Sequence, residues 1–424
     1  MNNQKNISNF FSRSILDALF PENYELLPNT HEVFALEFAR GESETLSKEK
    51  LIKRSGFFAR IDGEYTRHFQ MCQDTPMEEI RSGKTVWVKS FFEANRFSTG
   101  YATHSLFPYR GKFHPQLIKG ILNVIGVEEG ETVLDPMGGS GTACIEAQLM
   151  GFNSIGVDMN PFCTLITLAK SYALDVNVAN LKDWVDRNED TEWVKQLPNL
   201  IQKHDDVDSF ITNFAITGDK KVDLIILLSY LDAVGYSRRR KTGSVETLFP
   251  KVLGRYVSTI VSFDQTRKRL DISLGKLKAC TGDVLDLPLP TESIDAVVTS
   301  PPYSFAIDYV DNDKPQLEFL GVDIDELKTK TIGLQGKDKA EKIKNYFKAM
   351  NKAIEEMSRV LKSGKFCVIV IGSNEIQTGG IKHEKEFCTF AEGHHMMLRR
   401  DLVKSIQGIQ NSMREEHVLF FQKQ

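Results

Sequence analysis

The sequence predicts an α/β protein built on a parallel sheet, and two observations support this prediction. Short apolar strands alternate with helices over residues 107–173, and the same alternation resumes at residue 277. A glycine-rich turn links the first strand to the helix that follows it. The segment between the two parts, residues 175–276, lacks the alternation. The simplest organisation is therefore one α/β domain with an insertion.

The composition excludes several classes of protein. Of the 424 residues, 41% are hydrophobic and 26% are charged, which is ordinary for a globular chain. The net charge of −4 excludes a globally basic nucleic-acid binder, so any such contact must come from a local patch. The six cysteines include no C-x-x-C pair, which argues against a zinc framework or a disulfide scaffold. His394 and His395 lack neighbouring ligands at metal-binding spacing, so we predict no metal site.

The N-terminal residues, the longest apolar run and the cysteines indicate where the protein resides. Its N-terminal residues lack the long apolar region of a secretory signal. The longest apolar run, around residues 224–228, is far shorter than the roughly 20 residues that cross a bilayer. Cysteines without a disulfide pattern fit a reducing compartment. We therefore expect a soluble, cytoplasmic protein.

The elements of the predicted sheet can be placed along the chain. Residues 132–134 and 154–157 are short apolar runs typical of buried strands, and residues 143–150 between them are good helix formers. Further on, residues 294–298 predict another buried strand. Apolar side chains recur at helical spacing over residues 341–361, and we expect Gly364 to end this helix. The next strands are then predicted at residues 365–371 and 417–421.

The glycine-rich turn, residues 133–142, reads Val-Leu-Asp-Pro-Met-Gly-Gly-Ser-Gly-Thr. Glycines allow the backbone to pass close to a ligand, and the following helix offers free N–H groups at its start. The second strand ends at Asp158, where an acidic side chain suits a ribose diol. A plain strand-to-helix turn is the alternative, but Asp135 and Asp158 at matching strand ends favour a ligand site.

These segments, DPMGGSGT at 135–142 and GVDMNP at 156–161, resemble motifs I and II of the amino-methylating DNA methyltransferases. Met137 stands where that family usually has an aromatic residue, and its thioether can still pack against a cofactor. The resemblance implies a Rossmann-like, S-adenosylmethionine-dependent methyltransferase sheet. It implies that the cofactor contacts Asp135, Pro136, Met137, Gly138, Gly139, Gly141, Thr142, Asp158, Met159 and Asn160.

A second motif, Ser300-Pro301-Pro302-Tyr303, follows the strand at 294–298. Two prolines give a rigid loop with outward carbonyls. An exocyclic amine is a poor nucleophile because its lone pair is delocalised, so acceptors at Ser300 and the Pro301 carbonyl would draw its nitrogen toward tetrahedral geometry. Tyr303 offers a ring on which a base can stack. A proline-rich loop without catalytic activity is the alternative reading.

The Ser-Pro-Pro-Tyr spelling resembles the N4-cytosine group of the family, whereas Asp-Pro-Pro-Tyr and Asn-Pro-Pro-Tyr resemble the N6-adenine group. Cytosine N4 is therefore the favoured target and adenine N6 stays open. No Pro-Cys loop of the C5-cytosine enzymes is evident. Asp308 and Tyr309 continue the family-like loop, and we expect them to support the pocket; a plain surface loop is the alternative.

Two weaker motifs complete the predicted site. Asp283 and Val284 resemble motif III, whose acidic residue accepts from the cofactor adenine, although a turn aspartate is the alternative. Residues 107–116 resemble motif X, which places Phe113 and His114 near the methionine end of the cofactor. For His114 alone, a structural hydrogen bond is the favoured reading.

The insertion contains a basic segment. Residues 236–278 hold 11 Lys and Arg against 3 Asp and Glu, a net of +8 (11 − 3). Such a local excess fits phosphate contact, and a solvated helix face is the alternative. The predicted contacts are Arg238, Arg239, Arg240, Lys241, Arg267, Lys268 and Arg269. The implied partner is double-stranded DNA, from which the target base must be flipped out.

We divide the chain into four parts: residues 1–104, an N-terminal candidate for DNA contact; 105–174, the cofactor half of the core; 175–276, the candidate target-recognition insertion; and 277–424, the catalytic half. Three other functions stay open: N6-adenine methylation of DNA, guanine-N2 methylation of RNA, and a catalytically silent cofactor-binding protein. The sequence leaves open whether a cognate restriction endonuclease accompanies the chain.

Overall fold

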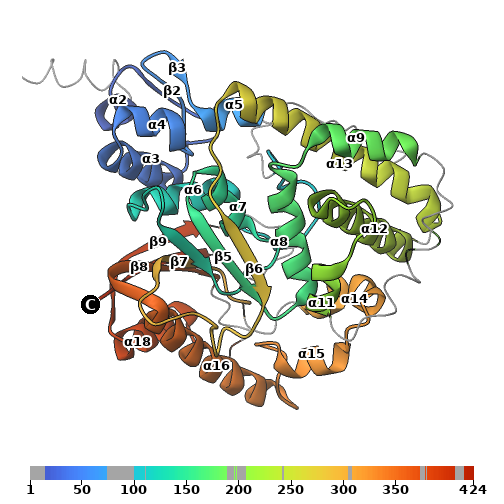
Figure 1. The fold of residues 1–424 in the computed structure, drawn as a ribbon. Helices are drawn as coiled ribbons and strands as arrows, with labels where there is room; N and C mark the ends of the chain where they lie inside the picture. The colour runs from blue at the N-terminus through green and yellow to red at the C-terminus, as the bar shows by residue number, and fades with distance from the viewer. Residues whose placement is uncertain are drawn as a thin grey trace, which may run out of the picture.

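In the computed structural model, the described residues are 15–73, 100–109, 111–188, 195, 197, 207–240, 243–303, 308–372, 378, 380–405 and 415–424. Within this part of the chain, no helix combines the length and the apolar character needed to cross a membrane. Figure 1 shows one central sheet with helices on both faces, and a helical layer at one side.

The central sheet has seven strands in the order β6-β5-β4-β7-β8-β10-β9. Their bounds are β4 Thr132–Asp135, β5 Asn153–Asp158, β6 Leu277–Thr281, β7 Ile294–Thr299, β8 Leu361–Gly372, β9 Met396–Ser405 and β10 Glu415–Lys423. The first five strands in this order pair in parallel, whereas β10 is antiparallel to both β8 and β9. Counted from β4, the order begins 3-2-1-4-5, as in doubly wound dinucleotide folds. The Rossmann-like prediction is confirmed, and the sheet is mixed rather than wholly parallel.

Alternation along the strands divides the core into two layers. Val133, Ala296 and Val368 face the helices α3 (Val33–Thr45), α6 (Pro115–Val124) and α7 (Thr142–Leu149). Their neighbours Leu134, Val297 and Cys367 face α16 (Lys339–Val360) and α18 (His383–Gly393). Because successive side chains in a strand point to opposite faces, the continuous apolar runs in the sequence fill both layers.

The end of α16 and the start of the next strand differ from the prediction. Gly364 does not end the helix, because α16 stops at Val360 and Gly364 lies inside β8. Leu361 already has extended backbone angles and pairs with Ile294 of β7. Strand pairing, rather than a glycine, therefore sets this boundary. The edge strand β9 was absent from the predicted elements.

The segment between β5 and β6 is helical. It contains α8 (Pro161–Ala173), α9 (Val178–Arg187), α11 (Val207–Asn213), α12 (Lys220–Arg240) and α13 (Val245–Arg269). The apolar run at 224–228 lies in α12, where every one of these residues is fully buried. Helix α12 packs against α8, α13 and α14 (Tyr309–Phe319). Its hydrophobicity therefore reflects a buried central position in this layer.

The N-terminal elements form a small subdomain on α6 (Figure 1). They are α2 (Ile15–Leu19), β1 (Tyr24–Leu26), α3, α4 (Lys48–Arg54), β2 (Phe58–Ile61), β3 (Glu64–Tyr65) and α5 (Arg67–Gln73). Glu42 is fully buried and accepts hydrogen bonds from Ser55, Gly56 and Asn123. Because Asn123 lies on α6, this buried network fixes the subdomain to the core.

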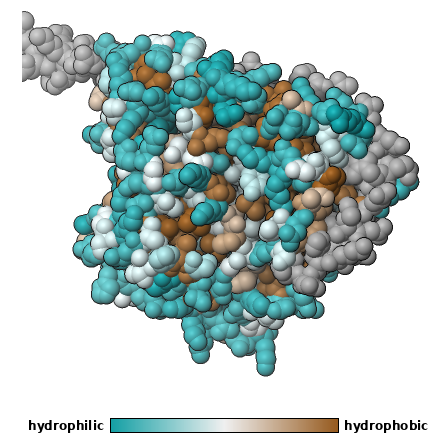
Figure 2. Space-filling model, in the orientation of Figure 1, coloured by the Kyte–Doolittle hydropathy of each residue, from teal (hydrophilic) through white to brown (hydrophobic). Residues whose placement is uncertain are grey.

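Figure 2 shows that hydrophilic side chains cover most of the face seen in Figure 1, with apolar side chains surfacing mainly toward its middle.

Candidate active site

Two corners of the sheet meet at one edge. The glycine turn follows β4, and the 300–303 loop follows β7, the strand that pairs with β4 in parallel. Both corners therefore lie at the carboxyl ends of neighbouring strands. The Thr299 hydroxyl donates a 2.8 Å hydrogen bond to Asp135 Oδ1, which joins the two corners directly. The spatial arrangement that the two motifs require is thus present.

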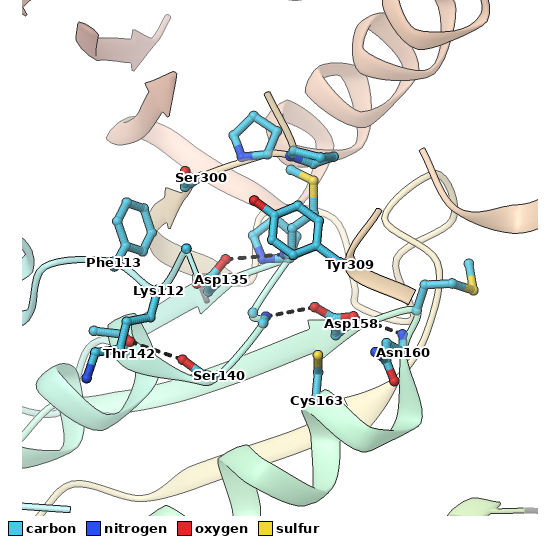
Figure 3. Close-up of a pocket in the computed structure, with 18 of the residues that line it drawn as sticks. Lys112, Phe113, Asp135, Ser140, Thr142, Asp158, Asn160, Cys163, Ser300 and Tyr309 are labelled. Atoms are coloured by element: carbon cyan, nitrogen blue, oxygen red, sulfur yellow. Dashed lines mark hydrogen bonds between the residues drawn. The ribbon is translucent and has the colours of Figure 1, made fainter. Parts of the chain in front are cut away.

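A cavity of about 470 Å³ opens between the corners, as the close-up in Figure 3 shows. Its lining includes all four residues of the 300–303 motif and every predicted cofactor residue except Gly141. Gly141 instead is the N-cap residue just before α7, with a φ of 76°, and a Cβ there would lie 2.5 Å from the Thr167 hydroxyl oxygen. Gly141 therefore packs closely on α8 and does not line the cavity, so its predicted cofactor contact stays a prediction.

Asp158 closes the glycine turn from the neighbouring strand. Its Oδ2 accepts from the Gly139 N–H at 2.7 Å and its Oδ1 accepts from the Asn160 N–H at 2.8 Å. Burial raises the pKa of this carboxyl, and the two backbone donors oppose that effect. Each carboxylate oxygen can accept more than one hydrogen bond, so Asp158 can hold the turn and still receive ligand hydroxyls.

Asp135 is the buried acid at the centre of the site. Figure 3 shows it with Ser300 and Phe113 on one side and Asp158 on the other. Its Oδ1 accepts from Thr299 and from the Met137 N–H. Burial raises its pKa to about 7, because these hydrogen bonds only partly offset the cost of an ionised carboxylate. A positively charged ligand group beside Asp135 would offset that cost.

The 300–303 loop is held by distant elements. The Tyr346 hydroxyl on α16 donates to the Pro302 carbonyl at 2.8 Å. Ser300 donates to the Tyr303 hydroxyl at 3.3 Å, and Tyr303 donates to Glu416 Oε1 on β10 at 2.6 Å. Burial raises the pKa of Tyr303 well above its usual range, so this tyrosine stays neutral. The Tyr303 ring is therefore anchored through its hydroxyl.

The weaker motifs also reach the cavity. Asp283 and Val284 line it just after β6, and Asp283 also accepts from the Leu285 N–H, as a turn aspartate would. Phe113 and His114, which belong to the motif X segment, also line the cavity. Burial lowers the pKa of His114 to about 3, so its imidazole is neutral. His114 therefore contributes no positive charge to the site.

Several lining residues were missed by the sequence analysis. Lys112 lies in the motif X segment, donates to the His104 carbonyl, and has its pKa lowered to about 8 by burial. Tyr309, expected only as loop support, lines the cavity and packs on Gly111. Lys404 and Glu416 come from β9 and β10. No local pattern marks these last two, because pairing between distant strands brings them to the site.

The predicted basic residues fall into two groups at opposite ends of α13. Helix α13 has 25 residues, so at 1.5 Å per residue its ends are about 36 Å apart. Arg238 pairs with Glu318 on α14, the helix that begins at the cavity with Tyr309. At the other end, Arg267 and Lys268 pair with Asp264 of their own helix, and Arg269 donates to Gln70 of α5. Lys241 and the side chains of Arg239 and Arg240 lie outside the described residues.

His394 has a structural partner. Its Nε2 lies 3.1 Å from Asn351 Oδ1 on α16. Among the residues that the structure describes, no group of His, Cys, Asp and Glu is arranged to hold a metal ion. The expectation that the chain has no metal site stays a prediction.

Two family models match the chain. Residues 105–213 match an RMKL-like methyltransferase domain, and residues 294–424 match a DNA methylase family. These ranges contain the glycine turn and the 300–303 loop respectively. These matches, and the Type II methyltransferases to which the chain is similar, relate it to the amino-methylating DNA methyltransferases.

Curated relatives match over parts of their length. Type II methyltransferase M.BsoBI of Geobacillus stearothermophilus is 24% identical over 61% of this chain and 61% of its own. Type II methyltransferase M.MjaII of Methanocaldococcus jannaschii is 35% identical over 30% of this chain and 26% of its own. A tRNA (guanine(10)-N2)-dimethyltransferase of the same organism is 32% identical over 28% of this chain and 34% of its own. The chain thus spans less than two thirds of each of these relatives.

Proposed function

We propose that this chain, a relative of the amino-methylating DNA methyltransferases, methylates an exocyclic amino group of a base in double-stranded DNA, with cytosine N4 as the favoured position. The observation that carries the proposal is the 2.8 Å bond from Thr299 to Asp135, which joins the glycine turn to the Ser-Pro-Pro-Tyr loop. A methyl donor held by the first corner and an amine held by the second would share one cavity.

S-adenosylmethionine is the cofactor, and the residues present fit it. The buried Asp135 carboxyl suits the cofactor ammonium, Asp158 suits the ribose hydroxyls, and Asp283 suits the adenine amino group. When bound, the cofactor supplies an electrophilic methyl group on a sulfonium. Met137 and Phe113 contribute apolar lining at the same cavity.

The protein acts on the base by orientation. Ser300 and the Pro301 carbonyl accept from the target amine and direct its lone pair, and the two prolines keep these acceptors rigid. Tyr303, anchored by Glu416, presents its ring to a base that has left the duplex stack. Because His114 is neutral and Tyr303 retains its proton, neither residue adds a charge to the cavity beside Asp135.

The duplex would contact the basic group at the end of α12. Arg238 is about half exposed, and its partner Glu318 lies on α14, whose first residue lines the cavity. The group at 267–269 lies against α5 instead, so it would serve contacts made together with the N-terminal subdomain. Binding through phosphates should weaken steeply as salt rises.

The decisive experiment detects the product. The purified chain is incubated with labelled S-adenosylmethionine and genomic DNA from a host that lacks DNA methylation, and the modified nucleoside is identified by mass spectrometry. N4-methylcytosine is the expected product. N6-methyladenine would retain the enzyme class and change the target base, while cofactor binding without transfer to any nucleic acid would favour the catalytically silent alternative.

A second candidate is methylation of guanine N2 in tRNA, because two matched relatives carry that activity in their names. It uses the same cavity and differs in the polymer. Parallel assays with duplex DNA and total tRNA separate the two candidates, since only one polymer should become labelled.

The matched Type II enzymes also suggest a restriction–modification setting with a cognate endonuclease. Sequencing modified bases in the DNA of an expression host would reveal the recognition sequence. DNA modified at that sequence should then resist an endonuclease of the same specificity.

A further inference from the structure

We propose that Glu416 is a positioning residue of the catalytic corner, which fixes the direction of the Ser300–Tyr303 hydrogen-bond chain so that Ser300 can accept from the target amine. The proposal rests on the proposed methyl transfer and adds a residue that no motif contains. Glu416 lies on β10, 113 positions after Tyr303 in the chain, and lines the same cavity.

The geometry gives a chain of three side chains. Tyr303 donates to Glu416 Oε1 at 2.6 Å, and Ser300 Oγ donates to the Tyr303 oxygen at 3.3 Å. The first of these is short, as expected for a hydrogen bond to a carboxylate. Glu416 is held in place because β10 pairs with β8 at Gly372 and with β9 at Lys404.

The direction of the chain follows from the chemistry of its last member. An ionised carboxylate can only accept hydrogen bonds. The Tyr303 hydroxyl, which has one hydrogen, must therefore donate its hydrogen bond to Glu416. The Tyr303 oxygen is then an acceptor, and it receives the hydrogen bond that the Ser300 hydroxyl donates. Ser300 therefore has no proton left to direct at the cavity, and its remaining lone pair can accept from an amine.

Lys404 lies on the other side of the Glu416 carboxyl group from Tyr303. Its Nζ lies 3.8 Å from Glu416 Oε2, and the Glu416 side chain is only 17% exposed. The Lys404 ammonium also lies over the Phe34 ring of α3, 5.9 Å from its centroid. The carboxylate is thus flanked by a tyrosine on one oxygen and a fixed cation on the other.

An ordinary cross-strand ion pair is the competing explanation. Such partly exposed pairs contribute little to stability, and their removal should leave catalysis unaffected. The contact between Glu416 and Tyr303 distinguishes the two explanations, since an ion pair with Lys404 alone would not require it.

The test uses Glu416→Gln, in which a side-chain amide can donate as well as accept, so the direction is no longer imposed. Methyl incorporation from labelled S-adenosylmethionine into genomic DNA from a methylation-free host should fall at least about tenfold in kcat, equal to about 1.4 kcal/mol. The Kd for S-adenosylmethionine and the melting temperature should stay at the wild-type values. Glu415→Gln, on the exposed neighbour in β10, is the matched control and should keep full turnover.

A second variant tests whether Glu416 acts through the tyrosine. Tyr303→Phe keeps the ring and removes the hydroxyl, and it should lower kcat by a similar factor. Because the residues act as one chain, the double variant should lose no more than the larger single loss. Wild-type turnover in either single variant, or losses that multiply in the double variant, would overturn the role of Glu416.

Failure of the proposed function looks different. A wild-type protein that binds S-adenosylmethionine but labels no DNA would overturn the methyl transfer itself, before any variant is compared.

Discussion

The two corners of the cavity are built in different ways. At the β4 corner, Asp135 bonds the Met137 N–H two residues away, and Asp158 binds backbone groups at the end of the adjacent strand. At the β7 corner, Ser300–Tyr303 are held by Tyr346 on α16 and by Glu416 on β10. The β4 corner is therefore held mainly through backbone N–H groups, and the β7 corner is held by side chains from distant elements.

On the proposed function, this difference would separate cofactor binding from methyl transfer. Changes at the β4 corner should alter cofactor affinity or stability, whereas changes at the β7 corner should alter turnover with the cofactor still bound. The following variants test that separation.

The largest effect is expected from Ser300→Ala. Loss of one oriented partner of the reacting group typically lowers kcat by about 10²–10³-fold. The Kd for S-adenosylmethionine, measured by calorimetry, should remain at the wild-type value because Ser300 belongs to the β7 corner. Ser363→Ala, an exposed serine near the start of β8, is the control. Full turnover in the Ser300 variant would remove this residue from the reaction.

At the β4 corner, Gly141→Ala should destabilise the fold by about 3 kcal/mol. The residue has φ of 76°, and the added methyl group would press on Thr167. Gly130→Ala is the matched control, since it also has positive φ but no atom within 4 Å of the added carbon, and should cost only about 1–2 kcal/mol. Denaturant unfolding measures both. Equal losses would show that backbone strain, and not packing on α8, dominates.

Asp158→Ala should weaken cofactor binding by about 10- to 100-fold. It removes the acceptor for the Gly139 and Asn160 N–H groups, and bonds to charged groups contribute about 1.5–3 kcal/mol. Titration calorimetry gives the Kd, and kcat at saturating cofactor should change much less. A variant that kept its affinity and lost only kcat would contradict the division between the corners.

The smallest effect concerns pH. Because burial raises the pKa of Asp135 to about 7, the free protein carries mostly a neutral carboxyl at pH 6 and an ionised one at pH 8. A cofactor ammonium prefers the ionised form, so affinity should rise about tenfold from pH 6 to pH 8. Asp135→Asn should bind with an affinity that is flat over this interval. A wild-type Kd independent of pH would show that Asp135 does not contact a cation.

The linked effect on stability has the opposite sign. A carboxyl whose pKa is higher in the folded state than in the unfolded state stabilises the fold below pH 3.8, and this contribution is lost as pH rises through about 7. The ligand-free protein should therefore gain stability from Asp135→Asn at pH 8 and not at pH 3.

The helical insertion shows where local sequence reasoning stops. The basic residues lie close together in the sequence, yet α13 separates Arg238 from Arg267–Arg269 by most of its length. The sequence analysis identified the apolar run at 224–228 but did not place it in the fold. Its burial on every side depends on the packing of α8, α13 and α14 around α12.

The sequence by itself determined the glycine turn, the Ser-Pro-Pro-Tyr loop and the strands that carry them. These features are local: glycine torsions, proline rigidity and alternating apolar runs act over a few consecutive residues. Gly364 was the exception, because pairing of Leu361 with Ile294 overrode a local helix stop.

Only the tertiary structure decided that Lys404 and Glu416 reach the cavity, that Gly141 packs on Thr167, and that β10 runs antiparallel between β8 and β9. The physical reason is that strand register and helix packing bring together residues that are distant in the chain, 113 positions apart in the case of Tyr303 and Glu416. No short stretch of sequence records those pairings, although they orient the hydroxyl chain on which the catalytic corner depends.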